Sequence, residues 1–443
     1  MGSYVPSTRE QRQEMLKAVG VASFEELYAD VPESMRLKEG ALNLPDGMSE
    51  MEIMARMKSM AGKNKVFTSI FRGAGSYNHY IPSIVKRVTA KEEFVTAYTP
   101  YQAEISQGVL QSIFEYQTMI CELTGMEVSN ASVYDGATAA AEAVAMCRDR
   151  KRTKALISAA AHPDLIQTVK TYCEGSNTPV EIIPAKDGKT DLDALSAMLD
   201  DSVCCVLIQQ PNYFGQLENA DQAGVIAHEA GAKYIMSCNP ISLGMIKTPA
   251  ESGADIAVGE GQPLGLSLSF GGPYLGFMAC TNALVRKIPG RIVGETTDVD
   301  GKRAYVLTLQ AREQHIRREK ASSNICSNQA LCALTASVYL SAMGTKGLQQ
   351  AAEQSFAKAH YFAAEMAKIP GCELRFSGEF FHEFVTSCPD VPKVMAALEA
   401  QGILGGLPLG GELSGCVLWC ATEQNSKEEI DRAIAVIKEV CGA

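Results

Sequence analysis

The 443-residue sequence has no long apolar run and no excess of basic residues. None of its apolar runs approaches the roughly 20 residues that span a bilayer. Its formal net charge of −11 opposes non-specific attraction to nucleic acid or to an anionic membrane. The N-terminus lacks the basic-then-apolar order of a secretory signal, and Pro6 stands where a myristoylation pattern has Ser or Thr. We therefore expect a cytoplasmic protein with no nucleic-acid and no membrane partner.

A disulfide framework is not indicated either. The 14 cysteines are scattered through apolar runs such as Val203–Ile208, where Cys behaves as a small hydrophobic residue, and this favours a reducing compartment. Cys416 and Cys420 lie four residues apart on a predicted strand and therefore on one face of it. Because no further Cys/His cluster follows them, we predict packing at this pair and no metal site in the chain.

Residues 1–65 are predicted to form an N-terminal helical segment. Thr8 and Ser49 each stand where a helix N-cap is expected, and Ser23 with Glu26 matches a capping box. After Ser49, methionines recur at a spacing of three: Met51, Met54, Met57 and Met60. A row of this kind indicates a helix face that fills a core or an interface.

Between residues 66 and 343, short apolar runs alternate with helical stretches. The alternation predicts a large α/β domain whose mostly parallel sheet is covered on both faces. The expected strands are Ala155–Ser158, Val180–Ile183, Val203–Gln209, Tyr234–Met236, Asp255–Val258 and Gly276–Ala279. The expected helices are Ile105–Leu123, Ala137–Arg148, Pro163–Cys173, Leu192–Leu199 and Ala220–Ala230.

Residues 344–443 predict a smaller C-terminal α+β domain, because strand-like and helical stretches are mixed there without the alternation of the preceding part. The expected strands are Glu373–Phe376, Phe381–Ser387 and Cys416–Ala421. The expected helices are Leu348–Ala367, Val391–Gln401 and Ser426–Val440.

No lysine occurs between Lys247 and Lys287. Within that stretch, residues 254–273 resemble the segment that anchors the cofactor in pyridoxal-phosphate (PLP) enzymes, where a lysine forms a Schiff base with the cofactor. In enzymes of the aspartate-aminotransferase fold, the strand corresponding to residues 234–238 ends in an Asp that keeps the pyridine nitrogen protonated. Ser237 and Cys238 stand at this strand end instead. Two requirements of PLP chemistry are thus missing, and we expect a degenerate site.

Residues typical of a cofactor pocket nevertheless surround this gap. Asp135, Gly136 and Thr138 open an Ala-rich helix, whose N-terminal amides either bind an anion such as a phosphate or are capped by Asp135. His162 follows a predicted strand, where it either stacks on a cofactor ring or forms structural hydrogen bonds. We expect these residues to form a vestigial cofactor pocket.

Three further segments carry polar and aromatic side chains on predicted loops, which hold function more often than cores do. These segments contain Tyr77 and Asn78; Tyr98, Tyr101 and Gln102; and Ser322, Ser323 and Asn324. The last of them follows a charge run, beginning at Arg312, that is typical of a solvated helix face.

Several stretches together resemble the glycine cleavage system P-protein family, most closely the alpha half, subunit 1, of its split bacterial form. They are Thr99–Gln102, Ser106–Gly108, Asn130–Ser132, Pro289–Gly294 and Arg312–Cys326. The resemblance implies fold type I of the PLP-dependent transferases and a partner, subunit 2, that carries the PLP lysine. It puts Gln262 near the place of that lysine and Ser237 near the place of the pyridinium Asp, so no catalytic residue is assigned to this chain.

The resemblance further implies a heteromeric glycine decarboxylase, inactive without its second chain, that transfers the aminomethyl group of glycine to the lipoyl group of H-protein. An (αβ)2 heterotetramer is expected. Since fold-type-I sites form at subunit interfaces, we expect the three loop segments to reach the partner's active site or the lipoyl channel.

Two other interpretations stay open at this point. The first is a self-sufficient PLP decarboxylase or lyase that uses a displaced lysine, for which Lys247 is the nearest candidate. The second is a non-catalytic scaffold that retains only the fold.

Overall fold

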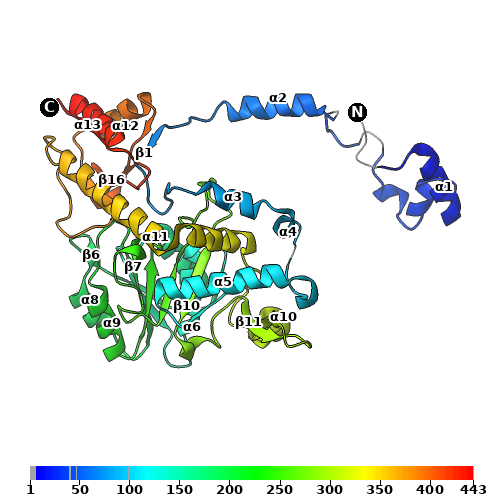
Figure 1. Cartoon of the computed structure of the whole chain (residues 1–443), viewed down its shortest axis with the longest axis horizontal. Coiled ribbons are helices and arrows are strands. Elements are labelled where there is room, and N and C mark those ends of the chain that lie inside the picture. Colours follow the sequence, from blue (N-terminus) through cyan, green and yellow to red (C-terminus); the bar gives the residue numbers. More distant parts are fainter. Residues whose placement is uncertain (1–5, 39–40, 46, 98, 443) are drawn as a thin grey trace. The chain divides into compact units, whose positions relative to one another are not determined.

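The computed structural model describes residues 6–38, 41–45, 47–97 and 99–442 (Figure 1). The predicted site residue Tyr98 lies outside the described residues. The chain divides into two units, one ending at Val66 and the other beginning at Phe67. None of the helices within the described ranges combines the length and the apolarity that crossing a bilayer requires.

The first unit consists of short helices: α1 (Arg9–Val19), two 3-10 turns (Glu25–Tyr28 and Glu33–Met35) and α2 (Glu50–Ala61). Thr8 and Ser49 cap α1 and α2 through complete capping boxes, as predicted. The box predicted at Ser23 is wrong, since Glu26 instead accepts a hydrogen bond from the backbone of Ala22.

The methionine row of α2 does not lie in a core. The four side chains at positions 51, 54, 57 and 60 are between 51% and 79% exposed, and neither α1 nor α2 has a buried residue. A role of this row in the core of the chain is therefore excluded for the described structure, whereas a role in an interface stays a prediction.

The second unit contains a seven-stranded sheet in which β10 alone runs antiparallel to its neighbours. In spatial order the strands are β2 (Val128–Ser129), β10 (Gly276–Cys280), β9 (Ile256–Glu260), β8 (Lys233–Cys238), β7 (Val203–Gln210), β3 (Lys154–Ser158) and β4 (Val180–Ile183). All six predicted strands are present, and the mostly parallel sheet is confirmed.

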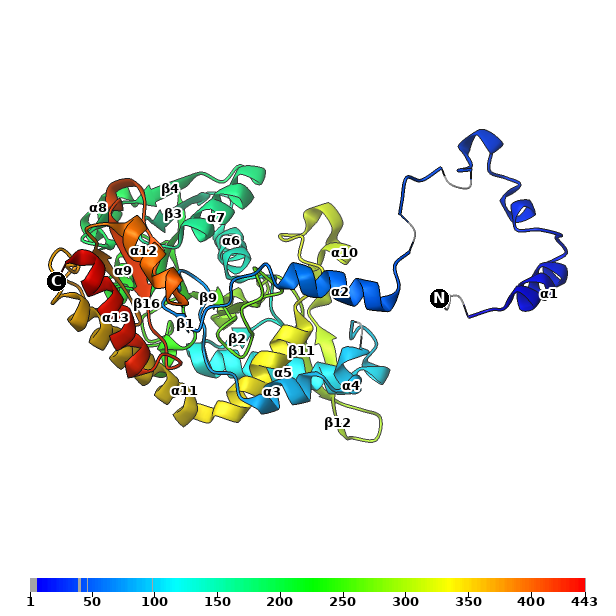
Figure 2. The same cartoon turned by 90° about the horizontal axis from the view of Figure 1, so that it is seen from above.

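Helices cover both faces of this sheet, because alternate residues of the strands point to opposite sides. Cys205 and Leu207 of β7 pack with α6 (Gly136–Cys147) and α7 (Pro163–Gly175). Val206 and Ile208 of the same strand pack with helices of the other face. Those helices are α5 (Gln107–Thr124), α8 (Leu192–Met198), α9 (Ala220–Glu229) and the first half of α11 (Ala330–Met366). Figure 2 shows α6 and α7 on one side of the strands and α5 on the other.

Several elements of this unit were not predicted from the sequence. They include a hairpin of β11 (Ile292–Thr297) and β12 (Arg303–Thr308), a small hairpin of β5 (Ala185–Lys186) and β6 (Lys189–Thr190), and the short helices α3 (Ser83–Thr89) and α4 (Glu92–Val95), whereas α10 (Gln314–Arg317) lies in the charge run. The solvated helix expected at the charge run is confirmed only in part. Residues 314–320 are exposed and form α10 followed by a 3-10 turn (Arg318–Lys320), whereas Arg312 is half-buried and donates to the carbonyl groups of Ile288 and Gly290.

The C-terminal residues form a second core around the buried Trp419. The core is built from β13 (Glu383–Ser387), β16 (Cys416–Cys420), α12 (Val391–Ala400), α13 (Lys427–Cys441) and the second half of α11, and β15 (Leu407–Pro408) pairs with β16 at the sheet edge. β1 (Ser69–Ile70) pairs with β14 (Ile403–Leu404), so the beginning of the second unit is hydrogen-bonded to its C-terminal part. The strand predicted at 373–376 is wrong, because only an isolated bridge from Leu374 to Thr386 forms.

Helix α11 is broken at Gly344, whose φ of 61° and ψ of −179° lie outside the helical region. The predicted boundary between the large and the small domain, after residue 343, falls at this kink. The three-part division at 65 and 343 itself stays a prediction.

Candidate functional site

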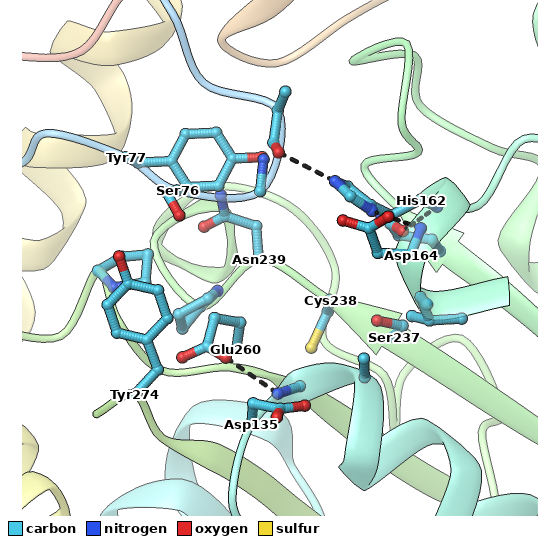
Figure 3. Close-up of a pocket in the computed structure, with 18 residues that line it drawn as sticks. Ser76, Tyr77, Asp135, His162, Asp164, Ser237, Cys238, Asn239, Glu260 and Tyr274 are labelled. Carbon is cyan, nitrogen blue, oxygen red and sulfur yellow. Dashed lines mark hydrogen bonds between the residues drawn. The ribbon is translucent and has the colours of Figure 1, made fainter. Parts of the chain in front are cut away.

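A cavity of about 260 Å³ opens at the carboxyl ends of the parallel strands β8 and β9, the edge of an α/β sheet where ligand sites are commonly found (Figure 3). The loop 74–77, the first turns of α6 and α7, and the segment after β8 surround it. Of the four predicted pocket residues, Asp135, Gly136 and His162 line the cavity, together with Tyr77 and Ser237, whereas Thr138 does not.

Gln262, at the predicted place of the missing lysine, is 1% exposed and fully hydrogen-bonded. Its Oε1 accepts from the backbone N–H of Tyr77 (2.9 Å), and its Nε2 donates to the carbonyls of Tyr77 (3.0 Å) and Leu266 (2.7 Å). The side chain therefore fixes the loop 73–80 to the segment after β9. An amide has the donor and acceptor that this requires, whereas a lysine ammonium has donors only.

The loop 73–80 is also fixed by buried carboxylates of the C-terminal part. Glu383 accepts from the backbone N–H of Ala74 (2.6 Å) and from the hydroxyl of Tyr77 (2.8 Å). Glu423 accepts from the N–H of Tyr80 (2.6 Å) and pairs with His79 (2.7 Å). Burial raises the pKa of Glu383 to about 7, and burial also raises the pKa of Tyr77 well above its ordinary value.

His162 is held by hydrogen bonds at both ring nitrogens. Its Nδ1 accepts from the N–H of Asp164 (3.1 Å), so the proton lies on Nε2, which donates to the carbonyl of Ala74 (2.9 Å). The ring packs edge-on against Tyr213, with 5.0 Å between the centroids. Of the two roles considered for His162, the structure displays the hydrogen-bonding one.

Two carboxylates occupy the N-terminus of α6. Asp135 is the N-cap and accepts from the N–H of Thr138 (2.7 Å), which confirms the capping alternative. Glu260, at the end of β9, accepts from the N–H of Gly136 (2.9 Å). Burial raises the pKa of Glu260 to about 7, and the nearby charge of Asp135 adds to the rise although backbone donors oppose it.

The cavity does not fit PLP. No lysine lines it, and the side chain at the expected lysine position is an amide whose polar atoms are all bonded. Ser237 lies buried on β8 at the predicted place of the pyridinium Asp, and it carries no charge to pair with a ring nitrogen. The end of α6 where a phosphate would bind already holds carboxylates, as described above.

Lys247, the candidate for a displaced lysine, does not line this cavity. It forms an ion pair with Asp221 on the surface, and its side chain is 64% exposed. The hydrogen bond to Asp221 raises the pKa of Lys247. A nucleophilic amine needs the opposite shift, because only its neutral form attacks a carbonyl.

The remaining predicted site residues lie outside the cavity. Asn78 accepts, through its carbonyl, a hydrogen bond from Thr422, and Gln102 is exposed. Tyr101 is 53% exposed, with the Arg291 guanidinium 4.1 Å from its ring centre. Ser322, Ser323 and Asn324 line a separate hollow beside α6 and α7.

The prediction from sequence missed the carboxylates that organise the site. Glu260 interrupts an otherwise apolar strand two residues before Gln262, and a charged residue at such a position was the available signal. Glu383 gave no comparable signal, because its partners Ala74 and Tyr77 lie more than 300 positions away in the sequence.

The raised pKa of Glu383 makes stability depend on pH. Between the ordinary value of 4.5 and about 7, the unfolded chain releases this proton and the folded chain keeps it, so stability falls as pH rises. We predict that Glu383→Gln removes part of this fall, up to about 3 kcal/mol. Urea unfolding at pH 5 and pH 8 measures the effect, with the exposed Glu412→Gln as the control that keeps the wild-type slope. Equal slopes in all three proteins would contradict the assignment.

Comparison with known proteins identifies the relatives of this chain. The model of the family described as "Glycine cleavage system P-protein" matches residues 2–437. The "Probable glycine dehydrogenase (decarboxylating) subunit 1" of Desulfitobacterium hafniense is 50% identical over 446 aligned positions, which cover 99% of this chain and all of that protein.

Solved structures agree with this. A crystal structure of glycine decarboxylase (P-protein) of the glycine cleavage system, in inhibitor-bound form, superposes with a TM-score of 0.94 at 41% identity and covers 99% of this chain and 100% of that one. A sphingosine-1-phosphate lyase of Burkholderia pseudomallei has a TM-score of 0.68 at 16% identity over 94% of each chain, which shows a shared fold alone. The predicted fold type I of PLP-dependent enzymes is thus confirmed, and the chain belongs to the glycine cleavage system P-protein family.

Proposed function

We propose that this chain is the subunit of a two-chain glycine decarboxylase that does not hold the cofactor, and that a second, lysine-bearing subunit does. Two observations carry the proposal: no lysine lines the cavity, and Gln262, beside it at the expected lysine position, is a buried amide with all its polar atoms hydrogen-bonded. The name "subunit 1" of a relative that is 50% identical supports the existence of a second subunit.

With subunit 2, the chain decarboxylates glycine and transfers the aminomethyl group to the lipoyl group of H-protein. The assembly is an (αβ)2 heterotetramer with PLP held by the beta subunit, as the family resemblance implies. A cytoplasmic location is supported by the cysteines, all of which are free thiols and most of which are buried.

The contribution of this chain is to shape the partner's site and to keep water from it. Tyr101 and Gln102 are exposed on the loop before α5 and are available to a second chain. Tyr77 and Asn78 belong to the firmly held loop 73–80, and Ser322, Ser323 and Asn324 flank a surface hollow. Residues of this kind position a substrate and exclude the water that would protonate a carbanion too early.

The first unit supplies a surface for the partner. Large apolar side chains are exposed along it, among them the four methionines of α2. Contiguous exposed apolar side chains are typical of interaction sites, and flexible methionines pack well against irregular surfaces. The occupant that we propose for the methionine row is the second subunit.

The alternatives have less support. A displaced catalytic lysine at position 247 is disfavoured by its surface ion pair and its raised pKa. A non-catalytic scaffold retains the fold equally well, and it differs from the proposal only in whether the partner needs this chain for turnover.

An exchange assay tests the proposed function. We expect each purified chain alone to be inactive in exchange of the glycine carboxyl group with labelled CO2, and the mixed chains with lipoylated H-protein to be active. Full activity of the partner alone would favour the scaffold, whereas activity of this chain alone would favour a self-sufficient enzyme.

The interface role of α2 has its own test. Replacing Met54 and Met57 by Ser removes apolar surface, and we expect about tenfold weaker association with the second subunit. Analytical ultracentrifugation of the mixed chains measures it. The matched control is Val225→Ser with Met245→Ser, two exposed apolar residues of the second unit. If both variants assemble as tightly as the wild type, α2 is not part of the interface.

A further inference from the structure

We infer that Glu260 is a built-in occupant of the anion-binding end of α6, and that it sets the ligand specificity of this cavity by excluding phosphorylated cofactors. The inference deepens the proposed function, on which it rests for the identity of the excluded cofactor. Besides the missing lysine, one side chain, that of Glu260, would thus prevent the cavity from binding such a cofactor.

The N-terminus of a helix attracts anions because its first amides have no partner inside the helix. In α6 these amides are already in use. Gly136 donates its N–H to Oε2 of Glu260 (2.9 Å), and Thr138 donates its N–H to Oδ1 of Asp135 (2.7 Å). A phosphate would have to displace carboxylates of the chain itself to use the same donors.

Glu260 is fixed in this position. Its Oε1 accepts from the N–H of Gln262 (2.9 Å) and from the N–H of Leu275 (3.0 Å), so both carboxylate oxygens are held by backbone donors. The strand end also lies very close to the helix. A Cβ on Gly136 would come within 2.7 Å of the Glu260 nitrogen, so the contact requires glycine there. The carboxylate thus belongs to the joint between β9 and α6 and is not a mobile surface group.

The charged residues that line the cavity also disfavour a phosphate. Asp135, Asp164 and Glu260 line it, and no lysine or arginine stands among the described lining residues (Figure 3). A phosphate dianion placed at α6 would meet the carboxyl groups of Asp135 and Glu260 without a cation to balance its charge. With its pKa raised to about 7, Glu260 is charged in part of the molecules at neutral pH, and that charge would repel the dianion. The cavity therefore offers carboxyl groups and no lysine or arginine to a phosphorylated ligand.

The test is ligand binding to the full-length chain. Pyridoxine 5′-phosphate is the probe because it lacks the aldehyde, so its binding does not require a lysine; pyridoxine and inorganic phosphate separate the contributions of the ring and of the phosphate. We expect no binding to the wild type by isothermal titration calorimetry. Glu260→Ala and Glu260→Ser free the Gly136 amide and remove a charge, and we expect them to bind pyridoxine 5′-phosphate at least tenfold more tightly than the wild type. The surface variant Glu251→Ala should behave as the wild type.

Binding of pyridoxine 5′-phosphate to the wild type as tight as to the variants would overturn the inference. So would a folded Glu260→Ala or Glu260→Ser, checked by circular dichroism, that gains no affinity. If neither variant folds, the wild-type titration still decides, because measurable binding there contradicts exclusion. No partner and no glycine enter this experiment, so its failure leaves the proposed two-chain activity standing, and failure of the exchange assay leaves this result standing.

Discussion

The side-chain amide of Gln262 is the contact on which the cavity depends, since it pairs with both backbone groups of Tyr77 and with the carbonyl of Leu266. Through Tyr77 the amide is linked to Glu383, and through the same loop Ala74 is linked to His162. Removing one member of such a buried network leaves its partners unsatisfied, which costs more than the bond itself contributes. At the position where the sequence predicted the missing lysine, the side chain holds the structure together.

Two buried carboxyl groups near the cavity, Glu260 and Glu383, also serve to hold the structure together. Glu260 and Glu383 each have a pKa near 7 because burial disfavours their charge, and each is held by hydrogen bonds from the chain. One carboxylate occupies the end of α6 and the other joins the loop 73–80 to β13. Both carboxylates serve the architecture around the cavity, and Glu260, which lines it, uses a backbone donor that a phosphate would need. The proposed division of labour, in which this chain contributes shape and the second chain holds the cofactor, is consistent with such a pocket.

The sequence predicted what is encoded locally. The caps at Thr8, Ser49 and Asp135 and the apolar strands were found because each depends on residues within a few positions of one another. The absence of lysine near Gln262 was equally visible in the sequence, and stretches such as Thr99–Gln102 and Arg312–Cys326 led to the correct family.

Interactions between distant segments could not be predicted in this way. Gln262 was singled out from the sequence, but its bonds to Tyr77 join positions 185 residues apart and were not predicted. Arg312 was expected to lie on a solvated helix, whereas carbonyl groups more than 20 positions earlier in the chain accept its hydrogen bonds. The α2 methionines show a third reason, since a periodic apolar row does not tell whether its partner lies in the same chain or in another.

The most direct measurement is to locate the cofactor in the assembled enzyme. Borohydride reduction of the purified two-chain complex fixes PLP to whichever lysine holds it, and peptide mass spectrometry then identifies that lysine. Our account predicts the pyridoxyl mass on the second subunit alone. A pyridoxyl label on any lysine of this chain, Lys247 included, would contradict it.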